Sequence, residues 1–292
     1  MPRSPMRNFG FELEFSSARV QSSMNDLNCR LNAFTTRRGH STTGSERAGN
    51  WTLKTDHCGF EFTSPAMKAT RQNFTKACAV VNKLKDICRE HRSNNLLAHQ
   101  TACTPECGFH VHLEINDLTG PQMRNLVNIF RTFEDAFLFL HAPSRRDNSY
   151  VYLLQHQDSF DFLGNNPRCS IPEEMNEHYL ALNFGQYNNR HTIEIRYASS
   201  TLVGRKVVNW IQILTCLVEF AKQLDNVPYQ RGQGVEDLKR FITAHETETW
   251  LDSRRATLAR WIDLRVEQLA AYQAAREERR ARRRQEREAN AA

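Results

Sequence analysis

Three short stretches of the chain alternate between apolar and polar residues, the pattern of a β-strand whose two faces meet different surroundings. The stretches are FGFELEF at 9–15, CGFHVHLEI at 107–115 and TIEIRY at 192–197. In each of them, aliphatic and aromatic side chains form one face. The other face carries, over the three stretches together, Glu12, Glu14, His110, His112, Glu114, Glu194 and Arg196. We therefore expect three strands of one sheet, with helices covering its apolar side.

The polar positions of these strands differ from those of an ordinary solvated sheet face, where Thr, Lys and Ser are usual. A half-buried sheet with a solvated face is the plain alternative for any one of the strands taken alone. Carboxylates that gather on one surface repel and raise one another's pKa, so the arrangement is costly unless cations neutralise it. A divalent metal ion in front of the sheet is the simplest remedy.

Spacing elsewhere in the chain predicts the helices that cover this sheet. Their expected positions are 22–34, 64 to about 92, 119 to about 141, about 205–224, one after 235 and one from 253. Ser64-Pro65 is a helix-start signal, because serine caps a first turn and proline fits within it. Further strands are expected at 51–56, 59–63 and 179–184. The pattern predicts an α+β fold with a curved, mainly antiparallel sheet backed by helices.

Changes in composition divide the chain into a main domain at 8–225, a helical extension at 226–268 and an Arg/Glu-rich tail at 269–292, helical or disordered. Residues 142–177 are rich in turn signals and are expected to form a lid or substrate loop. Of the net charge of +6, residues 276–288 supply +3 through seven arginines and four glutamates. Nucleic-acid binding is therefore expected only through this basic tail, which is otherwise a solvated helix.

Length and composition restrict the class of protein. With 292 residues, 40% of them hydrophobic and 25% charged, the chain suits one large globular domain. No apolar run approaches the ~18 residues of a membrane span, and the start lacks a signal-peptide pattern. We therefore expect a cytoplasmic protein with no membrane partner. The eight cysteines are scattered, which favours reduced thiols over a disulfide framework.

Four blocks, in order, resemble the conserved blocks of the amidoligase family. The blocks are FGFELEF at 9–15, WTLKTD at 51–56 with GFEFTSP at 59–65, CGFHVH at 107–112, and YLALN at 179–183 with TIEIR at 192–196 and Thr201. The resemblance covers about residues 8–220. It implies a glutamine-synthetase-like catalytic sheet. It also implies a reaction in which ATP phosphorylates a substrate carboxylate and an amine displaces the phosphate, with small molecules or peptides as substrates.

The same resemblance implies a role for each charged residue of the polar face. Glu14 and Glu61 would hold one divalent ion. A second ion, next to the ATP phosphates, would be held by Glu12, His110 and Glu194. Arg196 would neutralise the transferred phosphoryl group, and His112 would contact ATP or orient its neighbour.

The chemistry of these residue types fits such roles. Mg²⁺ prefers oxygen ligands, and phosphoryl transfer needs positive charge around the transferring oxygens. The planar guanidinium of Arg196 matches two phosphate oxygens better than an ammonium would. The imidazole of His110 would also suit Mn²⁺ or Zn²⁺, so Mn²⁺ is an alternative to Mg²⁺.

Four other polar residues are secondary candidates. Asp56 would bind the incoming ammonium or accept its proton, or it is a turn residue. Arg146 would bind a carboxylate or phosphate unless it is merely solvated. Asn183 would bind the nucleotide or cap a turn, and Lys54, which shares a strand face with Asp56, would contact the cofactor.

Three alternatives remain open from the sequence. Cys103 and Cys107 followed by His110 and His112 would suit a structural zinc site, although Cys107 should face away from the histidines. The acidic sheet would also suit a metal-dependent hydrolase or phosphotransferase. A nucleic-acid- or partner-binding protein acting through its Arg-rich tail is the third alternative.

Overall fold

The computed structural model describes the sheet and most of the helices of the chain. The described residues are 6–16, 51–56, 59–93, 103–104, 106–141, 151–154, 177 and 179–291, without the side chains of 55–56, 89–93 and 289–291. The predicted helix at 22–34 and most of the predicted loop at 142–177 lie outside the described residues.

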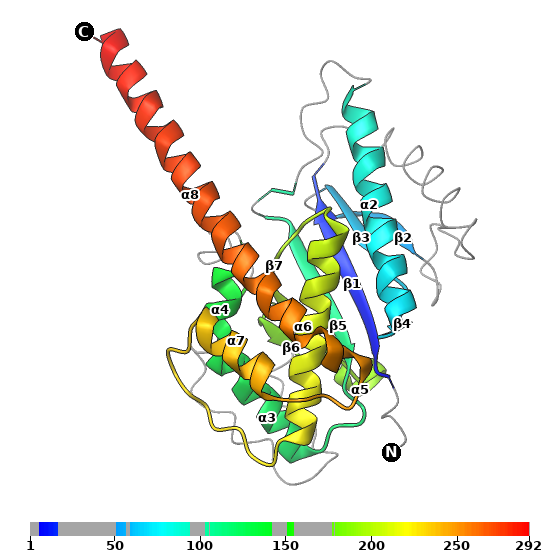
Figure 1. Cartoon of the computed structure of the whole chain (residues 1–292). Helices are drawn as coiled ribbons and strands as arrows, with labels where there is room; N and C mark the ends of the chain where they lie inside the picture. The colour runs from blue at the N-terminus through cyan, green and yellow to red at the C-terminus, as the bar shows by residue number, and fades with distance from the viewer. Residues whose placement is uncertain are drawn as a thin grey trace.

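A seven-stranded sheet forms the centre of the fold (Figure 1). Its strands are β1 (Asn8–Phe15), β2 (Thr52–Asp56), β3 (Gly59–Thr63), β4 (Met67–Lys68), β5 (Gly108–Glu114), β6 (Leu182–Asn183) and β7 (Thr192–Ser199). The order across the sheet is β2-β3-β1-β5-β7-β6, and β4 pairs with the other end of β1. All pairings between these strands are antiparallel. The three alternating stretches are neighbouring strands, as the sequence predicted.

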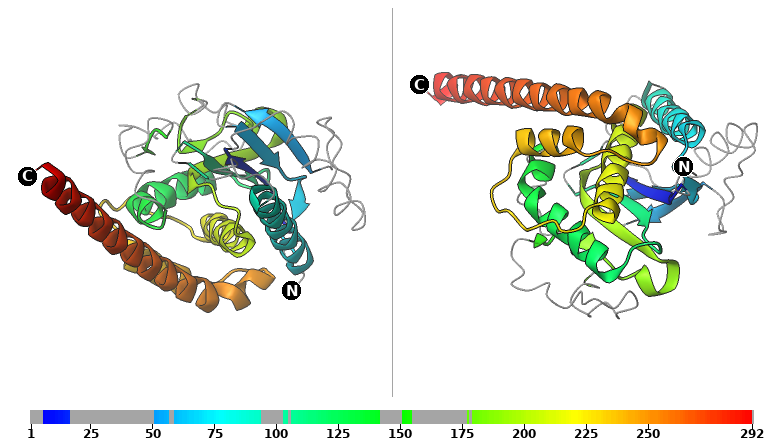
Figure 2. Two further views of the ribbon diagram at one scale, coloured as in Figure 1. Left: turned by 90° about the horizontal axis from the view of Figure 1, so that it is seen from above. Right: turned by 60° about the horizontal axis from the view of Figure 1, so that its bottom comes forward.

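Helices cover one face of this sheet, so the structure is the α+β fold that was expected. Figure 2 shows α2, α3 and α6 on the same side of the strands, with α8 beyond them. The helices are α2 (Arg71–Ser93), α3 (Gly120–Thr132), α4 (Glu134–Phe139), α5 (Tyr187–Arg190), α6 (Gly204–Gln223), α7 (Val235–Ala244), the 3-10 helix η4 (Trp250–Arg254) and α8 (Arg255–Ala291). None of the described helices combines the length and apolar character needed to cross a membrane.

The apolar side chains of β1, β5 and β7 form the core between the sheet and the helices. Phe11, Val111 and Ile195 lie in this layer, and each is 0% exposed. Trp51 stacks on Phe62 with ring centroids 5.3 Å apart. The cysteines of the described residues are all free thiols, as expected. Because the core occupies the helical side, the charged positions of the same strands are directed to the opposite side.

The structure corrects the predicted start of the second helix. The helix begins at Arg71, not at Ser64. The Ser64 hydroxyl accepts a hydrogen bond from the Phe11 amide at 2.9 Å, and the Ser64 amide donates to the Phe11 carbonyl at 2.8 Å. Met67 then pairs with Phe9 in β4. Sheet pairing with β1 therefore outweighs the local Ser-Pro signal.

Two other predicted elements are shorter than expected. The helix predicted at 119–141 is interrupted at Phe133, which packs on Phe241 of α7 with ring centroids 5.1 Å apart. Of the strand predicted at 179–184, Leu182 and Asn183 alone form a named strand. Leu180 instead makes an isolated parallel bridge with Tyr152.

Candidate active site

The strand register places the predicted charged residues in three rows across the polar face. Residues directly opposite each other in a sheet have Cβ atoms ~4.5–5.5 Å apart, so each row is a set of neighbours. The rows are Lys54–Glu61–Glu14, Glu12–His110 and His112–Glu194–Asn183. These rows come from six strands, and they meet over β1, β5 and β7.

A β-bulge next to the middle row positions Arg196. Phe109 pairs with Ala198 and Val111 pairs with Ile195, so Arg196 and Tyr197 together oppose His110. Such a bulge changes the direction of neighbouring side chains. The guanidinium of Arg196 donates to the Glu194 carboxylate and lies 3.4 Å from Nδ1 of His110. Tyr197 is 0% exposed, and its hydroxyl donates to Glu134 at 2.7 Å.

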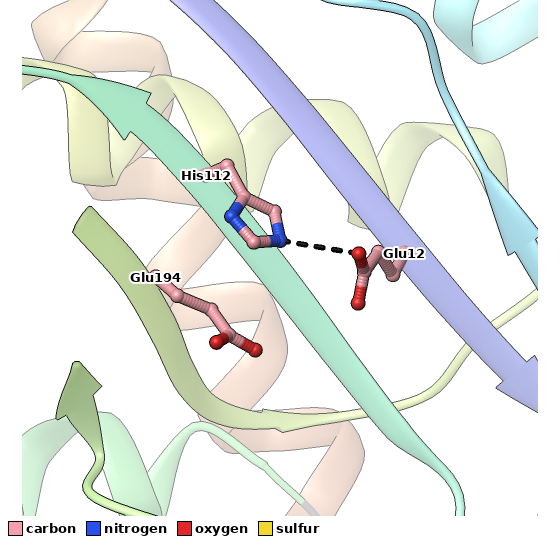
Figure 3. Close-up of side chains that lie close together, drawn as sticks. All are labelled: Glu12, His112 and Glu194. Atoms are coloured by element: carbon pink, nitrogen blue, oxygen red, sulfur yellow. Dashed lines mark ion pairs between the residues drawn. The ribbon is translucent and has the colours of Figure 1, made fainter. Parts of the chain in front are cut away.

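Glu12, His112 and Glu194 form a group with the geometry of a metal site. One donor atom from each lies within 4.8 Å of the others, and Nε2 of His112 is 3.3 Å from Oε1 of Glu12. Figure 3 shows the three side chains on neighbouring strands, with helices behind the sheet. Within the described part of the chain, these three residues are the one set of His, Cys, Asp or Glu side chains whose donor atoms lie close enough together to share a metal ion.

His110 lies beside this group and contacts three carboxylates. Its Nδ1 is 3.4 Å from Oε2 of Glu12 and 3.3 Å from Oε1 of Glu194. Its Nε2 is 3.6 Å from Oε1 of Glu14, and the residue is 4% exposed. Adjacent ligands of an octahedral Mg²⁺ ion lie about 3 Å apart, since each is about 2.1 Å from the metal. These spacings suit side chains that share cations.

Glu14 and Glu61 are cross-strand partners that are already stabilised by the protein. Glu14 accepts a hydrogen bond from the Gly108 amide at 2.6 Å. Glu61 accepts from the Thr63 hydroxyl at 2.9 Å and lies 2.9 Å from the Lys54 ammonium. Lys54 therefore neutralises Glu61 in this arrangement. The sequence pattern did not single out Thr63, although it shares the polar face two residues after Glu61.

The pKa values of the site reflect this crowding of charges. Burial alone would raise the pKa of Glu12, but the hydrogen bonds and charges of His110 and His112 outweigh it and hold the pKa far below its ordinary value. Burial and the charge of Glu12 raise the pKa of Glu61 despite Lys54. Burial would lower the pKa of His112, yet Glu12 and Glu194 raise it above its ordinary value. The carboxylates thus attract cations strongly.

Two observations test whether the site suits a metal ion and a phosphate. Carboxylate oxygens with one or two imidazoles are a donor set for Mg²⁺, Mn²⁺ or Zn²⁺. Beside them, Nε of Arg196 is buried and has no hydrogen-bond partner among the described residues. A buried donor of this kind is costly unless a ligand accepts its hydrogen bond. The residues of the site therefore suit both a divalent metal ion and a phosphate group.

Of the other secondary candidates, the structure describes the side chain of Asn183. The Asn183 side chain donates to the Glu177 carbonyl and accepts from the Gly185 amide, each at 2.6 Å, so it braces a turn. Asp56 pairs with Gly59 at the end of β2, but its side chain lies outside the described residues, as does all of Arg146.

The cysteines of the zinc alternative do not approach the histidines. Cys107 contacts the Thr104 hydroxyl at 3.2 Å, and Cys103 packs against the core. No described metal-donor group contains either thiol.

Comparison with protein families identifies the class of protein. Residues 5–218 match the profile of a family described as "Putative amidoligase enzyme". No curated protein gives a match. Among solved structures, the complex between Prokaryotic Ubiquitin-like Protein Pup and its ligase PafA is similar, with 10% sequence identity and a TM-score of 0.41. That match covers 91% of this chain and 65% of the matched chain. The protein described here therefore spans less than two thirds of the length of the matched chain.

Proposed function

The chain belongs to the amidoligase family, and we propose that it is an ATP- and divalent-metal-dependent ligase that joins a carboxylate to an amine through an acyl phosphate. The substrates are small molecules or peptides that carry these two groups. The observation that supports this proposal best is the meeting of Glu12, His112 and Glu194 from three strands, with His110 and Arg196 beside them.

The first role of these residues is to hold cations. In the proposal, Glu12 and Glu194 bind one divalent ion together with His110, and His112 adds a donor from the same face. Glu14 and Glu61 bind a second ion. In the absence of that ion, the Lys54 ammonium neutralises the Glu61 carboxylate. When bound, ATP would supply the phosphoryl group that activates the substrate carboxylate, and the metal ions would neutralise charge on the phosphate oxygens.

The second role is to neutralise and orient phosphate oxygens. Arg196 is 7% exposed, and its Nε donor is free within the described part of the chain, so a phosphate oxygen is a suitable acceptor. The bulge fixes the guanidinium beside the carboxylates and so limits the reorganisation needed on binding. Asp56 is proposed to accept a proton from the amine, and Arg146 and Asn183 to contact phosphate or nucleotide.

The test is an assay for coupled product formation. The full chain is incubated with ATP, Mg²⁺ or Mn²⁺, and pooled carboxylates and amines, and products are identified by mass spectrometry. We expect ADP and phosphate in amounts equal to a new amide, and only when both substrates are present. A metal-dependent hydrolase would form product without ATP, and a phosphotransferase would consume ATP without an amine. Either result would contradict the ligase proposal.

A matched variant links the assay to the site. Glu12→Gln removes one carboxylate charge without changing the size of the side chain, and we expect Mn²⁺ affinity to fall at least tenfold, measured by titration calorimetry. The control is Glu267→Gln, an exposed position on α8 that should leave Mn²⁺ affinity unchanged. Equal Mn²⁺ affinity in the Glu12 variant and the wild type would show that this carboxylate is not a ligand.

A further inference from the structure

A cavity of about 320 Å³, called here the helical-side cavity, lies on the helical side of the sheet. It is bounded by the end of β7, the first turn of α6 and the middle of α8, and Phe109 of the apolar core forms part of its wall. Phe109 precedes His110 on β5, and consecutive strand residues point to opposite faces of a sheet. Because no residue of the candidate active site lines the cavity, the cavity is separate from that site.

Two cationic side chains face this cavity without an acidic partner. Lys206 and Arg265 both line it, and its lining contains no aspartate or glutamate among the described residues. Arg265 donates to the Leu140 carbonyl at 3.1 Å and to the Gln268 side chain at 3.0 Å. Within the described part of the chain, neither cation takes part in an ion pair. Burial lowers the pKa of both, and the charge of Arg265 lowers that of Lys206 further.

Two buried donors in the lining also lack partners. Ser200 is 8% exposed and Trp210 is 1% exposed, yet neither the Ser200 hydroxyl nor the Trp210 Nε1 has a hydrogen-bond partner among the described residues. Unsatisfied buried donors are rare and costly in folded proteins. The N-terminus of α6, a 20-residue helix, adds partial positive charge at the same place. All of these features favour a negatively charged ligand.

The remaining wall is apolar and largely aromatic. Trp261 is 6% exposed and Leu269 is 9% exposed, and both line the cavity from α8. Tyr272, which is 52% exposed, stands at the edge. Small-molecule sites usually combine such apolar surface with a few converging polar groups. The volume is at the lower end of the range for ligand pockets, ~300–1,000 Å³.

We propose that this cavity binds a small organic anion, with its carboxylate or phosphate group against Lys206, Arg265 and Ser200 and an aromatic body against Trp261. The site does not depend on the ligase chemistry, because it shares no residue with the candidate active site. Its ligand is a second molecule that the enzyme recognises on its helical side.

Titration calorimetry on the full chain tests the proposal with four probes. Phenylacetate and phenyl phosphate carry the two anionic groups on the same ring, phenylacetamide is the uncharged control, and inorganic phosphate lacks the ring. We expect at least one ring-bearing anion to bind at least tenfold more tightly than phenylacetamide, and inorganic phosphate to bind at least tenfold more weakly than that anion. The better anion identifies the head group. Equal affinity for anion and amide, or no binding of either anion, would overturn the proposal.

Variants locate the binding in this cavity. Lys206→Met keeps the apolar stem of the side chain and should weaken anion binding at least tenfold, whereas Lys206→Arg should restore it. Ser200→Ala should weaken binding without lowering the melting temperature, because the hydroxyl has no partner to lose. Arg205→Met removes the same charge from an exposed neighbour outside the cavity and should have no effect. If Arg205→Met weakened binding as much as Lys206→Met, the attraction would be general charge and the assigned site would be wrong.

Discussion

His110 is the side chain on which the charges of the polar face converge. It contacts Glu12, Glu14 and Glu194 within 3.6 Å, and the Arg196 guanidinium approaches its Nδ1 at 3.4 Å. Alternation along the sequence was sufficient to place these side chains on one face, because the period of a strand is two residues. The separate grouping of Glu12 with His112 was not predicted, since it depends on side-chain directions across three strands.

The first prediction at the residue scale concerns Arg196. Arg196→Lys keeps one positive charge but loses the planar fork and the free Nε donor, so we expect ATP turnover to fall about 10²–10³-fold, the usual cost of losing one preorganised donor. The melting temperature should stay within a few degrees of the wild type. Phosphate release and thermal melting measure the two effects. Normal ATP turnover in the variant would show that Arg196 is not part of the active site. Arg205→Lys is the control for the general loss of a guanidinium group.

Asp117 provides a prediction about pH. Burial would raise its pKa, but the charges of Arg7 and Lys222 outweigh this effect and lower it below the ordinary value of 3.8. A carboxyl whose pKa is lower in the folded than in the unfolded protein stabilises the fold above its unfolded pKa, and this stabilisation disappears as pH falls through the folded value.

We therefore expect Asp117→Asn to lower stability at pH 7 by about 1 kcal/mol or less, since the side chain is partly solvated. The difference from the wild type should shrink as the pH falls below 3.8 and through the lowered pKa of folded Asp117. Thermal melts across this range measure it. A difference that stays constant with pH would show that the ion pairs are not its cause, and Glu236→Gln, an exposed partner of Lys239, is the control.

At the scale of the elements, the sequence predicted the types of the strands and long helices and missed their local adjustments. The bulge opposite His110 leaves the alternation of residues 192–197 intact, so no local pattern reveals it. The Ser64-Pro65 pair is a normal helix-start signal. The Ser64 hydroxyl, however, accepts a hydrogen bond from β1, so this segment continues the sheet and does not start a helix. The break at Phe133 likewise follows from packing against α7. In each case a contact distant in sequence decides the structure.

The crossing of α2 and α6 leads to a prediction about Gly204. A Cβ added to Gly204 would overlap the carbonyl oxygen of Cys78, a backbone atom that cannot turn away. We expect Gly204→Ala to destabilise the protein by about 1–3 kcal/mol, as overpacking of a tight contact does. Urea denaturation measures the change. Gly234→Ala is the control, because its nearest contact is the Asp237 carboxylate at 3.9 Å, and a loss no larger than the control's would contradict the argument.

At the scale of the whole molecule, the sheet separates two chemically different sides. The polar side carries the candidate active site, and the helical side carries the core and the helical-side cavity. Helix α8 contributes Leu258, Trp261 and Ile262 to that core, but beyond Leu269 its described side chains are mainly exposed. The tail therefore adds little to the stability of the fold.

This leads to a prediction for truncation. Removal of residues 276–292 should change the melting temperature by less than about 2 °C and leave ATP turnover unchanged, because the lost helix makes exposed contacts such as Arg282 with Glu286, worth ~0.3–0.5 kcal/mol at most. Calorimetry and the phosphate-release assay test it. A large fall in either quantity would mean that the basic helix stabilises or completes the enzyme.

The long α8 also has a hydrodynamic consequence. Its last 20 residues, from Tyr272 to Ala291, form a rod about 30 Å in length at 1.5 Å per residue, and Figure 1 shows this end pointing away from the rest of the molecule. Friction grows with such elongation, so the 33.9 kDa monomer would leave a gel-filtration column earlier than a sphere of that mass. An apparent mass above 33.9 kDa on a column calibrated with spherical standards would therefore not by itself indicate a dimer.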